Sequence, residues 1–352
     1  MPRTLVPVSR REFVLSAAAF AGAAAFPAFL RAQEKAPPRP AEFYDWKEVR
    51  PGFHVALGRT GDDMTLVGGN ATLVVEKGRG RGGRAVLIDT KQAVLGPALV
   101  REAMFRCEGL HRVVNTHHHF DHAGGNSAAS QGGVVMWAHP KCRERISASI
   151  AQYTAQLDQK ISALEQAGVE GAREAAVEAK RFRDTLAERK PETFIPEAIP
   201  ENVKDFAGRR VEVHHAGPGH TDNDLFFFFP EDNVLVTGDL VFNGSHPYYD
   251  STAGADSKGW INALSRVVSL CDADTVVVPG HGPITNIDGV KKQIRYIEDV
   301  REAVGKAVKE GRSREEVEKL RLPAYAEYGL KPAAGLIMAG VWDELNGKKD
   351  AK

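Results

Sequence analysis

Short runs of mainly apolar residues, several of them separated by turn residues, mark the first part of the chain, a pattern typical of strands. The strand candidates are residues 53–57, 71–75, 85–89, 112–116 and 134–138. Apolar positions spaced as in a helix cover residues 93–106, between the third and fourth candidates. The glycine- and arginine-rich segment 77–84 predicts the turn between the second and third strands. This half of the chain therefore predicts a mixed core of strands and helices.

The spacing of apolar residues becomes helical over residues 142–189. Residues three and four positions apart line one face of a helix, and the residues that do so are Ile146, Ile150, Tyr153, Leu157, Ile161 and Leu164. The segment 168–171 interrupts this spacing, and Ala172, Ala175, Ala179, Phe182 and Leu186 continue it. We expect a helical hairpin inserted at about residues 142–190. It is a candidate for a homodimer contact, for a lid over a site, or for a packed element with neither role.

Strand character returns after the expected hairpin. The candidates are residues 210–214, 225–229, 234–237 and 275–278, with a helical pattern over 258–270. The turn residues Pro230-Glu231-Asp232-Asn233 join two of these strands into a predicted hairpin. The strands and helices thus fall into two similar blocks. We expect an α+β domain over residues 43–310 and a helical extension over residues 311–352.

The first residues of the chain have the pattern of an export signal. A twin-arginine pair, Arg10-Arg11, precedes an alanine-rich stretch that is too short and too mildly apolar for a good membrane span. We expect a twin-arginine signal peptide over residues 1–32, cleaved after Ala32, and a proline-rich linker over residues 33–42. The expected location is the periplasm, with no stable membrane insertion of the mature chain. The alternative is an uncleaved anchor.

Composition excludes some classes of function. The chain has 352 residues, with 46 Lys and Arg against 46 Asp and Glu. This balance argues against a duplex nucleic-acid partner, which favours a basic excess. Cys107, Cys142 and Cys271 lie far apart without a CxxC pair, so they predict buried small residues rather than disulfides or a cysteine-rich zinc site.

One short segment after a predicted strand is rich in metal-binding side chains, and its residues are His117, His118, His119, Phe120, Asp121 and His122. Imidazole nitrogens and carboxylate oxygens are good zinc ligands. In an extended segment, His117 and His119 point to the same side and can reach one metal. Asp121 and His122 lie where the chain turns into a helix, and can reach a second. Downstream, the same residue types follow strand-like runs at His220, Asp239 and His281.

The ordered motifs His-x-His-x-Asp-His, Gly-His-Thr, Gly-Asp and Gly-His-Gly resemble the metallo-β-lactamase superfamily over roughly residues 50–290. The resemblance implies a four-layer αββα sandwich with two Zn²⁺ ions at one edge of its sheets. It also implies a ligand set in which His117, His119 and His220 bind the first zinc, Asp121, His122 and His281 bind the second, and Asp239 bridges them.

The activity that the resemblance implies is hydrolysis of a small-molecule ester, lactone, thioester or amide by a metal-bound hydroxide. Asp121 is the expected catalytic residue, because it can orient the nucleophile and carry a proton. Asp89 and Thr221 are candidates for supporting the metal ligands. His246, Tyr248 and Tyr249 follow Asp239 closely and are candidates for substrate contacts. His118 is expected to face away from the metals, and His214 and His215 to be strand residues.

Several branches of the superfamily are distinguished by single residues. Diiron oxygen reductases carry glutamate where His119 stands, and many β-lactamases carry cysteine near the position of Asp239. Residues 240–245 lack the basic pattern of glyoxalase-type thioesterases. β-Lactamase activity stays open, because residues 219–224 resemble that branch. The remaining alternatives are a mononuclear iron enzyme such as a persulfide dioxygenase, and a metal-binding accessory protein.

Overall fold

A computed structural model describes residues 43–59, 68–79, 83–93, 95–168 and 195–347, with residues 172–173, 176–177, 179–180 and 183 between the last two ranges. All of them belong to one compact unit, residues 38–352. The predicted signal peptide and the predicted linker lie outside the described residues.

The larger sheet has seven strands among the described residues, in the order of the chain. They are β1 (Tyr44–Arg50), β2 (Phe53–Gly58), β3 (Ala71–Val75), β4 (Arg84–Ile88), β5 (Gly109–Val114), β6 (Val135–Ala138) and β7 (Glu197–Ala198). The first four strands pair antiparallel, and β4 to β7 pair parallel. The sequence pattern missed β1, because this edge strand carries charged residues on its exposed positions.

The second sheet has the order β10 (Glu212–His214), β11 (Phe226–Phe229), β12 (Val234–Phe242) and β13 (Val276–His281). A separate small ribbon pairs β8 (Asp205–Phe206) with β9 (Arg209–Arg210). Strand β12 continues five residues beyond its predicted end at Thr237, and all nine of its residues are buried. The sequence pattern did not predict this continuation, because Asp239 is polar and Gly238 is flexible, with a φ of 51°. Asp239 therefore lies inside a strand rather than after one.

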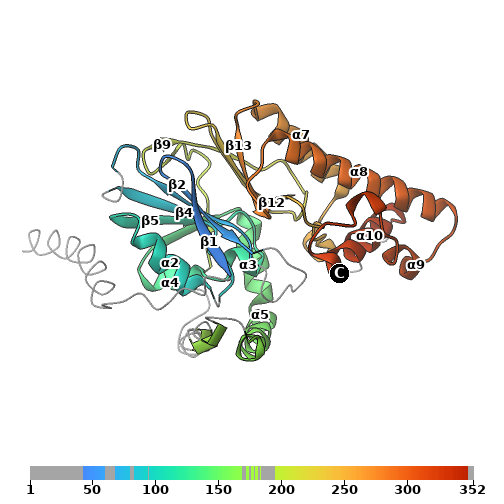
Figure 1. The fold of residues 1–352 in the computed structure, drawn as a ribbon, viewed down its shortest axis with the longest axis horizontal. Coiled ribbons are helices and arrows are strands. Elements are labelled where there is room, and N and C mark those ends of the chain that lie inside the picture. Colours follow the sequence, from blue (N-terminus) through green and yellow to red (C-terminus); the bar gives the residue numbers. More distant parts are fainter. Residues whose placement is uncertain are drawn as a thin grey trace, which may run out of the picture. The chain divides into compact units, whose positions relative to one another are not determined.

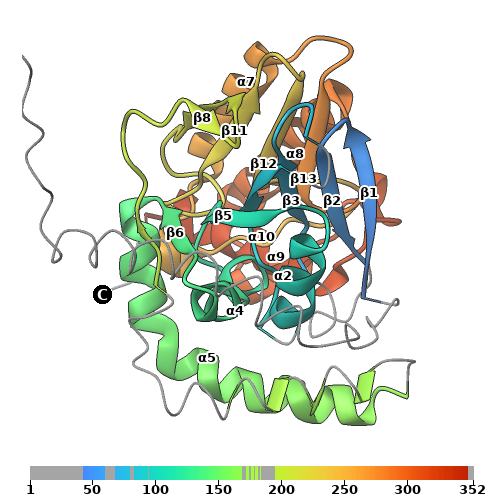
Figure 2. The same ribbon diagram turned by 90° about the vertical axis from the view of Figure 1, so that its left-hand side faces the viewer.

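The two sheets pack face to face around a shared apolar core (Figures 1 and 2). Phe53 and Val74 of the first sheet belong to the same buried cluster as Phe227 and Val236 of the second. Helices cover the outer faces (Figure 1). On the first sheet these are α2 (Gly96–Met104) and α4 (Asn126–Gln131), and on the second α7 (Ser257–Leu270) and α8 (Ile287–Lys309). The predicted four-layer α+β sandwich is confirmed.

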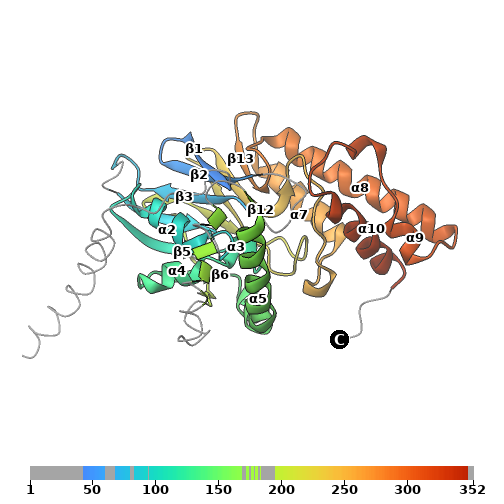
Figure 3. The ribbon, with the colours of Figure 1, turned by 60° about the horizontal axis from the view of Figure 1, so that its bottom comes forward.

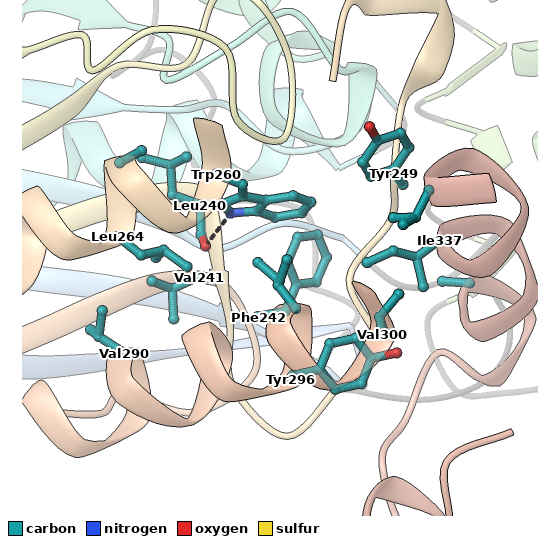
Figure 4. Packing of buried hydrophobic residues seen from close by; sticks show 14 of the residues in the cluster. Leu240, Val241, Phe242, Tyr249, Trp260, Leu264, Val290, Tyr296, Val300 and Ile337 are labelled. Carbon is teal, nitrogen blue, oxygen red and sulfur yellow. Dashed lines mark hydrogen bonds between the residues drawn. The ribbon is translucent and has the colours of Figure 1, made fainter. Parts of the chain in front are cut away.

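A second buried cluster joins the outer face of the second sheet to its helices (Figure 4). The Trp260 indole donates a hydrogen bond of 2.9 Å to the Leu240 carbonyl, which fixes α7 against β12. The remaining helical elements are α3 (Phe120–Ala123), η3 (Ser251–Ala253), α9 (Arg314–Glu318), η4 (Pro323–Tyr325) and α10 (Lys331–Leu345). Ile337 of α10 joins the same cluster, so the C-terminal helices share the core of the domain. None of the helices in the described ranges is both long and apolar enough to cross a bilayer.

Helix α5 (Pro140–Gln166) forms the first arm of the expected hairpin (Figures 2 and 3). Ile161 and Leu164 are buried on it. The described residues between 172 and 183 are helical and pair with it, since Lys180 Nζ lies 2.5 Å from Glu165 and Arg183 lies 2.9 Å from Asp158. The expected end of the hairpin, residues 184–190, lies outside the described residues.

Candidate metal centre

The chain brings its metal-binding side chains to one place from four segments. The extended stretch after β5 carries His117 and His119, and α3 begins at Phe120 with Asp121 and His122 in its single turn. His220 lies in the loop between β10 and β11, while Asp239 and His281 lie in the paired strands β12 and β13. The seven residues form two groups, His117, His119, His220 and Asp239 in one, and Asp121, His122, Asp239 and His281 in the other.

Asp239 is the residue that the two groups share. Its Oδ2 lies 3.5 Å from His220 Nε2 and 3.3 Å from His281 Nε2, and its Oδ1 lies 2.9 Å from His122 Nε2. Within each group, the nearest nitrogen and oxygen atoms all lie within 4.8 Å of one another. The structure therefore places the predicted ligands in the predicted sets, with one carboxylate between them.

In the first group, three imidazole nitrogens converge. His119 Nδ1 lies 3.1 Å from His117 Nε2 and 2.9 Å from His220 Nε2. The other nitrogen of each ring has an acceptor: Asp250 Oδ2 is 2.7 Å from His119 Nε2, and the Tyr248 carbonyl is 2.8 Å from His220 Nδ1.

The ring of His117, the third in this group, also has an acceptor next to its outer nitrogen. His117 Nδ1 lies 2.9 Å from Thr116 Oγ1, whose own hydrogen goes to Asp89 Oδ2 at 2.8 Å. A neutral imidazole has one N–H, so in all three rings the proton is on the outer nitrogen. Three lone pairs therefore face one another about 3 Å apart, an arrangement that a cation between them would stabilise.

In the second group, too, a hydrogen bond on the outer nitrogen of a histidine ring leaves the inner nitrogen as an acceptor. His122 Nδ1 donates to Asp89 Oδ2 at 2.8 Å, so its Nε2 lone pair faces Asp239 Oδ1. That buried oxygen has no hydrogen-bond donor among the described residues. Asp121 Oδ2 lies 3.0 Å from His281 Nε2. When His122 is neutral, an acceptor nitrogen therefore faces an acceptor oxygen, and this position suits either a proton or a metal ion.

Electrostatics in the second group favours a positive charge. Burial opposes charge on His122, but Asp239, Asp121 and Asp89 raise its pKa well above the ordinary value. Burial likewise opposes charge on His281, but Asp239 and Asp121 raise its pKa to about 9. The carboxylates of Asp239 and Asp121 thus draw protons to this group, and a divalent cation could take the place of those protons. The residues present fit the pair of metal ions that the superfamily pattern implies.

Hydrogen bonds from neighbouring residues orient four of the five histidine rings, those of His117, His119, His122 and His220. The predicted support from Asp89 is present: its carboxylate accepts from His122 and from both the Thr116 amide and hydroxyl. Thr221 supports a predicted ligand indirectly, through the loop that carries it. Its amide and hydroxyl donate to the buried Asp224, at 2.9 Å and 2.6 Å, and so fix the loop that carries His220.

The three predicted substrate residues lie in different surroundings. The Tyr248 ring packs 5.6 Å from the His119 ring and 6.2 Å from the His220 ring, beside the first group. The Tyr249 hydroxyl lies 3.0 Å from the Ala255 carbonyl and 2.9 Å from Glu344 Oε2 of α10, and this side chain is part of the core. His246 hydrogen-bonds to Tyr296 at 2.8 Å and lines a cavity of about 330 Å³ beside η4 and α10.

Two of the other histidines depart from the sequence-based expectation: His118 forms a third candidate metal group with His119 and Asp250, and His215 lies just after a strand rather than in it. His118 lies outside both four-residue groups, with its Nδ1 3.1 Å from Asn223 Nδ2. His214 ends β10 and stacks on Phe226, while His215 follows it and hydrogen-bonds to the Asp224 carbonyl. Cys107 and Cys142 are buried free thiols, and Cys271 is a half-buried free thiol.

Sequence reasoning missed three residues of the centre. Asp250 holds His119, although 131 positions separate them. Asn70 Nδ2 donates to the Pro279 and Gly282 carbonyls on either side of His281. Lys91 is fully buried, donates to the Gly69 carbonyl at 2.6 Å, and burial lowers its pKa to about 7. A charged residue three positions after a buried strand was the available signal for Lys91.

Comparisons with known proteins agree with this geometry. The family model of the metallo-beta-lactamase superfamily matches residues 64–281. The chain is 30% identical over 83 residues to the type 2 metallo-beta-lactamase of Bacillus cereus, which is 24% of this chain and 32% of that protein. It is 37% identical over 78 residues to a hydroxyacylglutathione hydrolase of Rhizobium meliloti, which is 22% of this chain and 28% of that protein. The match thus spans about a third of each relative's length.

Solved structures agree on the fold. A metallo-beta-lactamase from Pontibacter korlensis superposes with a TM-score of 0.50 at 19% identity, covering 72% of this chain and 99% of that one. The chain belongs to the metallo-beta-lactamase superfamily. Its centre has the His and Asp groups with which members of this superfamily bind metal ions, and the superfamily includes metal-dependent hydrolases.

Proposed function

We propose that this protein is a periplasmic hydrolase with two zinc ions per chain, which cleaves an ester, lactone, thioester or amide. One observation carries the metal count: Asp239 belongs to both ligand groups, and each group has three further ligands of its own. Ligand sets of imidazole and carboxylate suit zinc. The periplasmic location is supported by the Arg10-Arg11 pattern of the sequence.

The proposed metals would supply Lewis acidity and lower the pKa of a bound water toward about 7. The chain's own residues supply orientation and proton transfer. The Asp121 side chain is 25% exposed, whereas that of Asp239 is 3% exposed. Asp121 is therefore the carboxylate that can reach both a water molecule at the centre and the solvent, and it can orient the attacking water and carry its proton away.

Support for the substrate class comes from the centre and from the relatives. Asp239 rather than cysteine between the groups favours the thioesterase and lactonase branches over cysteine-type β-lactamases. The relative from Rhizobium meliloti is a hydroxyacylglutathione hydrolase by name, and that from Bacillus cereus is a metallo-beta-lactamase. β-Lactams and thioesters therefore belong on the same substrate panel as lactones and simple esters.

Elemental analysis combined with that panel tests the proposal. We expect two zinc ions per wild-type chain and hydrolysis of at least one substrate class. Asp239→Ala should bind less than one zinc, because both groups lose a ligand. A wild-type chain with a single iron and no hydrolysis would contradict the proposal, and so would a variant at Asp239 that keeps two zinc ions.

A further inference from the structure

Two cationic side chains of α5 contact Asp222, in the loop that carries His220: Lys141 Nζ lies 3.4 Å from Asp222 Oδ2, and the closer contact belongs to Arg145. Arg145 Nη2 donates to Asp222 Oδ2 at 2.8 Å, and its Nη1 donates to the Thr252 carbonyl at 2.9 Å. Asp222 lies two residues after His220, and Thr252 lies two residues after Asp250. Arg145 thus joins α5 to the two loops that serve the first ligand group.

Two arms of a hydrogen-bond network lead from Arg145 toward the first ligand group. The first arm runs through side chains. Asn223 Nδ2 lies 3.1 Å from both Asp222 Oδ1 and His118 Nδ1. Because the amide donates to His118 Nδ1, the proton of that ring is on Nε2, which lies 3.7 Å from Asp250 Oδ2.

That arm ends on a metal ligand. Asp250 Oδ2 accepts the hydrogen bond from His119 Nε2, so the position of Asp250 sets the direction of the His119 ring.

The second arm runs through the backbone. The Thr252 carbonyl that Arg145 binds belongs to η3, and the Asp250 side chain caps this turn by accepting from the Thr252 and Ala253 amides. The Asp222 amide donates to the Ala253 carbonyl at 2.8 Å, which ties the two loops together. Both arms therefore end on Asp250.

The second ligand group is held by other residues. Asp89 orients His122, and Asn70 fixes the backbone around His281. Asp89 also supports His117 through Thr116, so it serves both groups. The hydrogen bonds of Arg145 to Asp222 and Thr252 serve the loops of His220 and Asp250. Its removal should therefore affect the two metals unequally.

We propose that Arg145 is a positioning residue for the first metal group, and that the hairpin braces the metal centre rather than serving only as a surface element. This inference rests on the proposed two-metal centre. The ion pair is stronger than an ordinary surface pair, because the guanidinium contacts both carboxylate oxygens and a carbonyl in fixed geometry.

Zinc release into excess chelator tests the inference without relying on activity. A His281→Ala background keeps the first group intact, and a His220→Ala background keeps the second. In the first background, Arg145→Gln should accelerate zinc release about 5- to 20-fold, somewhat less than a change in a directly bonded partner. In the second background it should leave the release rate unchanged.

Two further variants separate positioning from folding. Arg183→Gln breaks a comparable ion pair elsewhere in the hairpin, between Arg183 and Asp158. In the His281→Ala background, this variant should release zinc at the same rate as His281→Ala alone. Arg145→Lys keeps the charge but cannot contact Asp222 and Thr252 together, so its release rate should be intermediate. If Arg145→Gln fails to fold by circular dichroism, the lysine variant carries the test.

The possible results distinguish this inference from the proposed function. A wild-type chain that retains no zinc contradicts both. A wild-type chain with two zinc ions, combined with unchanged release from the Arg145 variants, contradicts only the role of Arg145. Equal acceleration in both backgrounds also contradicts it, because a general loss of stability would then explain the effect.

Discussion

Asp89 Oδ2 accepts a hydrogen bond of 2.8 Å from His122 Nδ1, although 33 positions separate the two residues. Asp89 has a φ of 64°, a left-handed backbone conformation that is costly for a residue with a side chain. The surrounding structure holds it there, with its carboxylate also bound to Thr116. The contact holds the His122 ring in its orientation.

Asp89→Asn should weaken zinc binding about 10- to 100-fold with the fold retained. The carboxylate now accepts three hydrogen bonds, and an amide must turn its NH₂ group toward at least one of those donors. Competition against a chelator of known affinity measures the loss. An unchanged zinc affinity in this variant would show that His122 is oriented by other groups.

Asp121→Ala should abolish hydrolysis, since it removes both a ligand of the second group and the proposed proton carrier. Burial would raise the pKa of Asp121, but His122 and His281 hold it well below its ordinary value, so the carboxylate is ionised at neutral pH. The measurement is kcat on the best substrate of the panel, with circular dichroism as the control for folding. Full activity in this variant would exclude Asp121 from the site.

The free energy of unfolding should depend on pH through Asp224. Burial raises the pKa of this carboxyl to about 7, against the hydrogen bonds from Thr221 that lower it. The unfolded carboxyl titrates near about 3.9. Between about pH 4 and pH 7 the folded state therefore binds more protons than the unfolded state, and the stability contributed by Asp224 falls as pH rises through this window.

Urea unfolding of the metal-free protein at pH 5 and pH 8 checks this dependence. Relative to Asp224→Asn, which cannot ionise, the wild type should lose about 1–4 kcal/mol between the two pH values. An identical pH dependence in both proteins would mean that Asp224 titrates alike in the folded and unfolded states.

His246→Ala should lower stability and leave the zinc content unchanged. The side chain is buried between aromatic rings, and its loss would enlarge a cavity and remove the partner of the Tyr296 hydroxyl. We expect a loss of about 2–4 kcal/mol in urea unfolding. Tyr296→Phe, which removes only the hydroxyl, should cost about 1 kcal/mol. A raised KM with unchanged stability would instead support the predicted substrate contact.

The sequence by itself determined the chemistry of the ligands and the type of fold. His117 and His119 alternate in an extended stretch, and Asp121 and His122 begin a helix, so local geometry alone separates them into two directions. Apolar runs located most strands, because strand burial depends on the residues of the strand itself. The charged edge strand β1 and the polar part of β12 departed from that pattern and were missed.

Only the tertiary structure decided how those ligands are oriented and supported. Asp250 meets His119, Asn70 fixes the His281 loop, and Arg145 joins the hairpin to both loops of the first group. Each of these contacts joins residues more than 75 positions apart in the sequence. The residues adjacent to either partner in the sequence therefore do not indicate the contact. Hydrogen-bond partners of buried groups are selected by the packing of whole elements, whereas the chemistry of a ligand belongs to the residue itself.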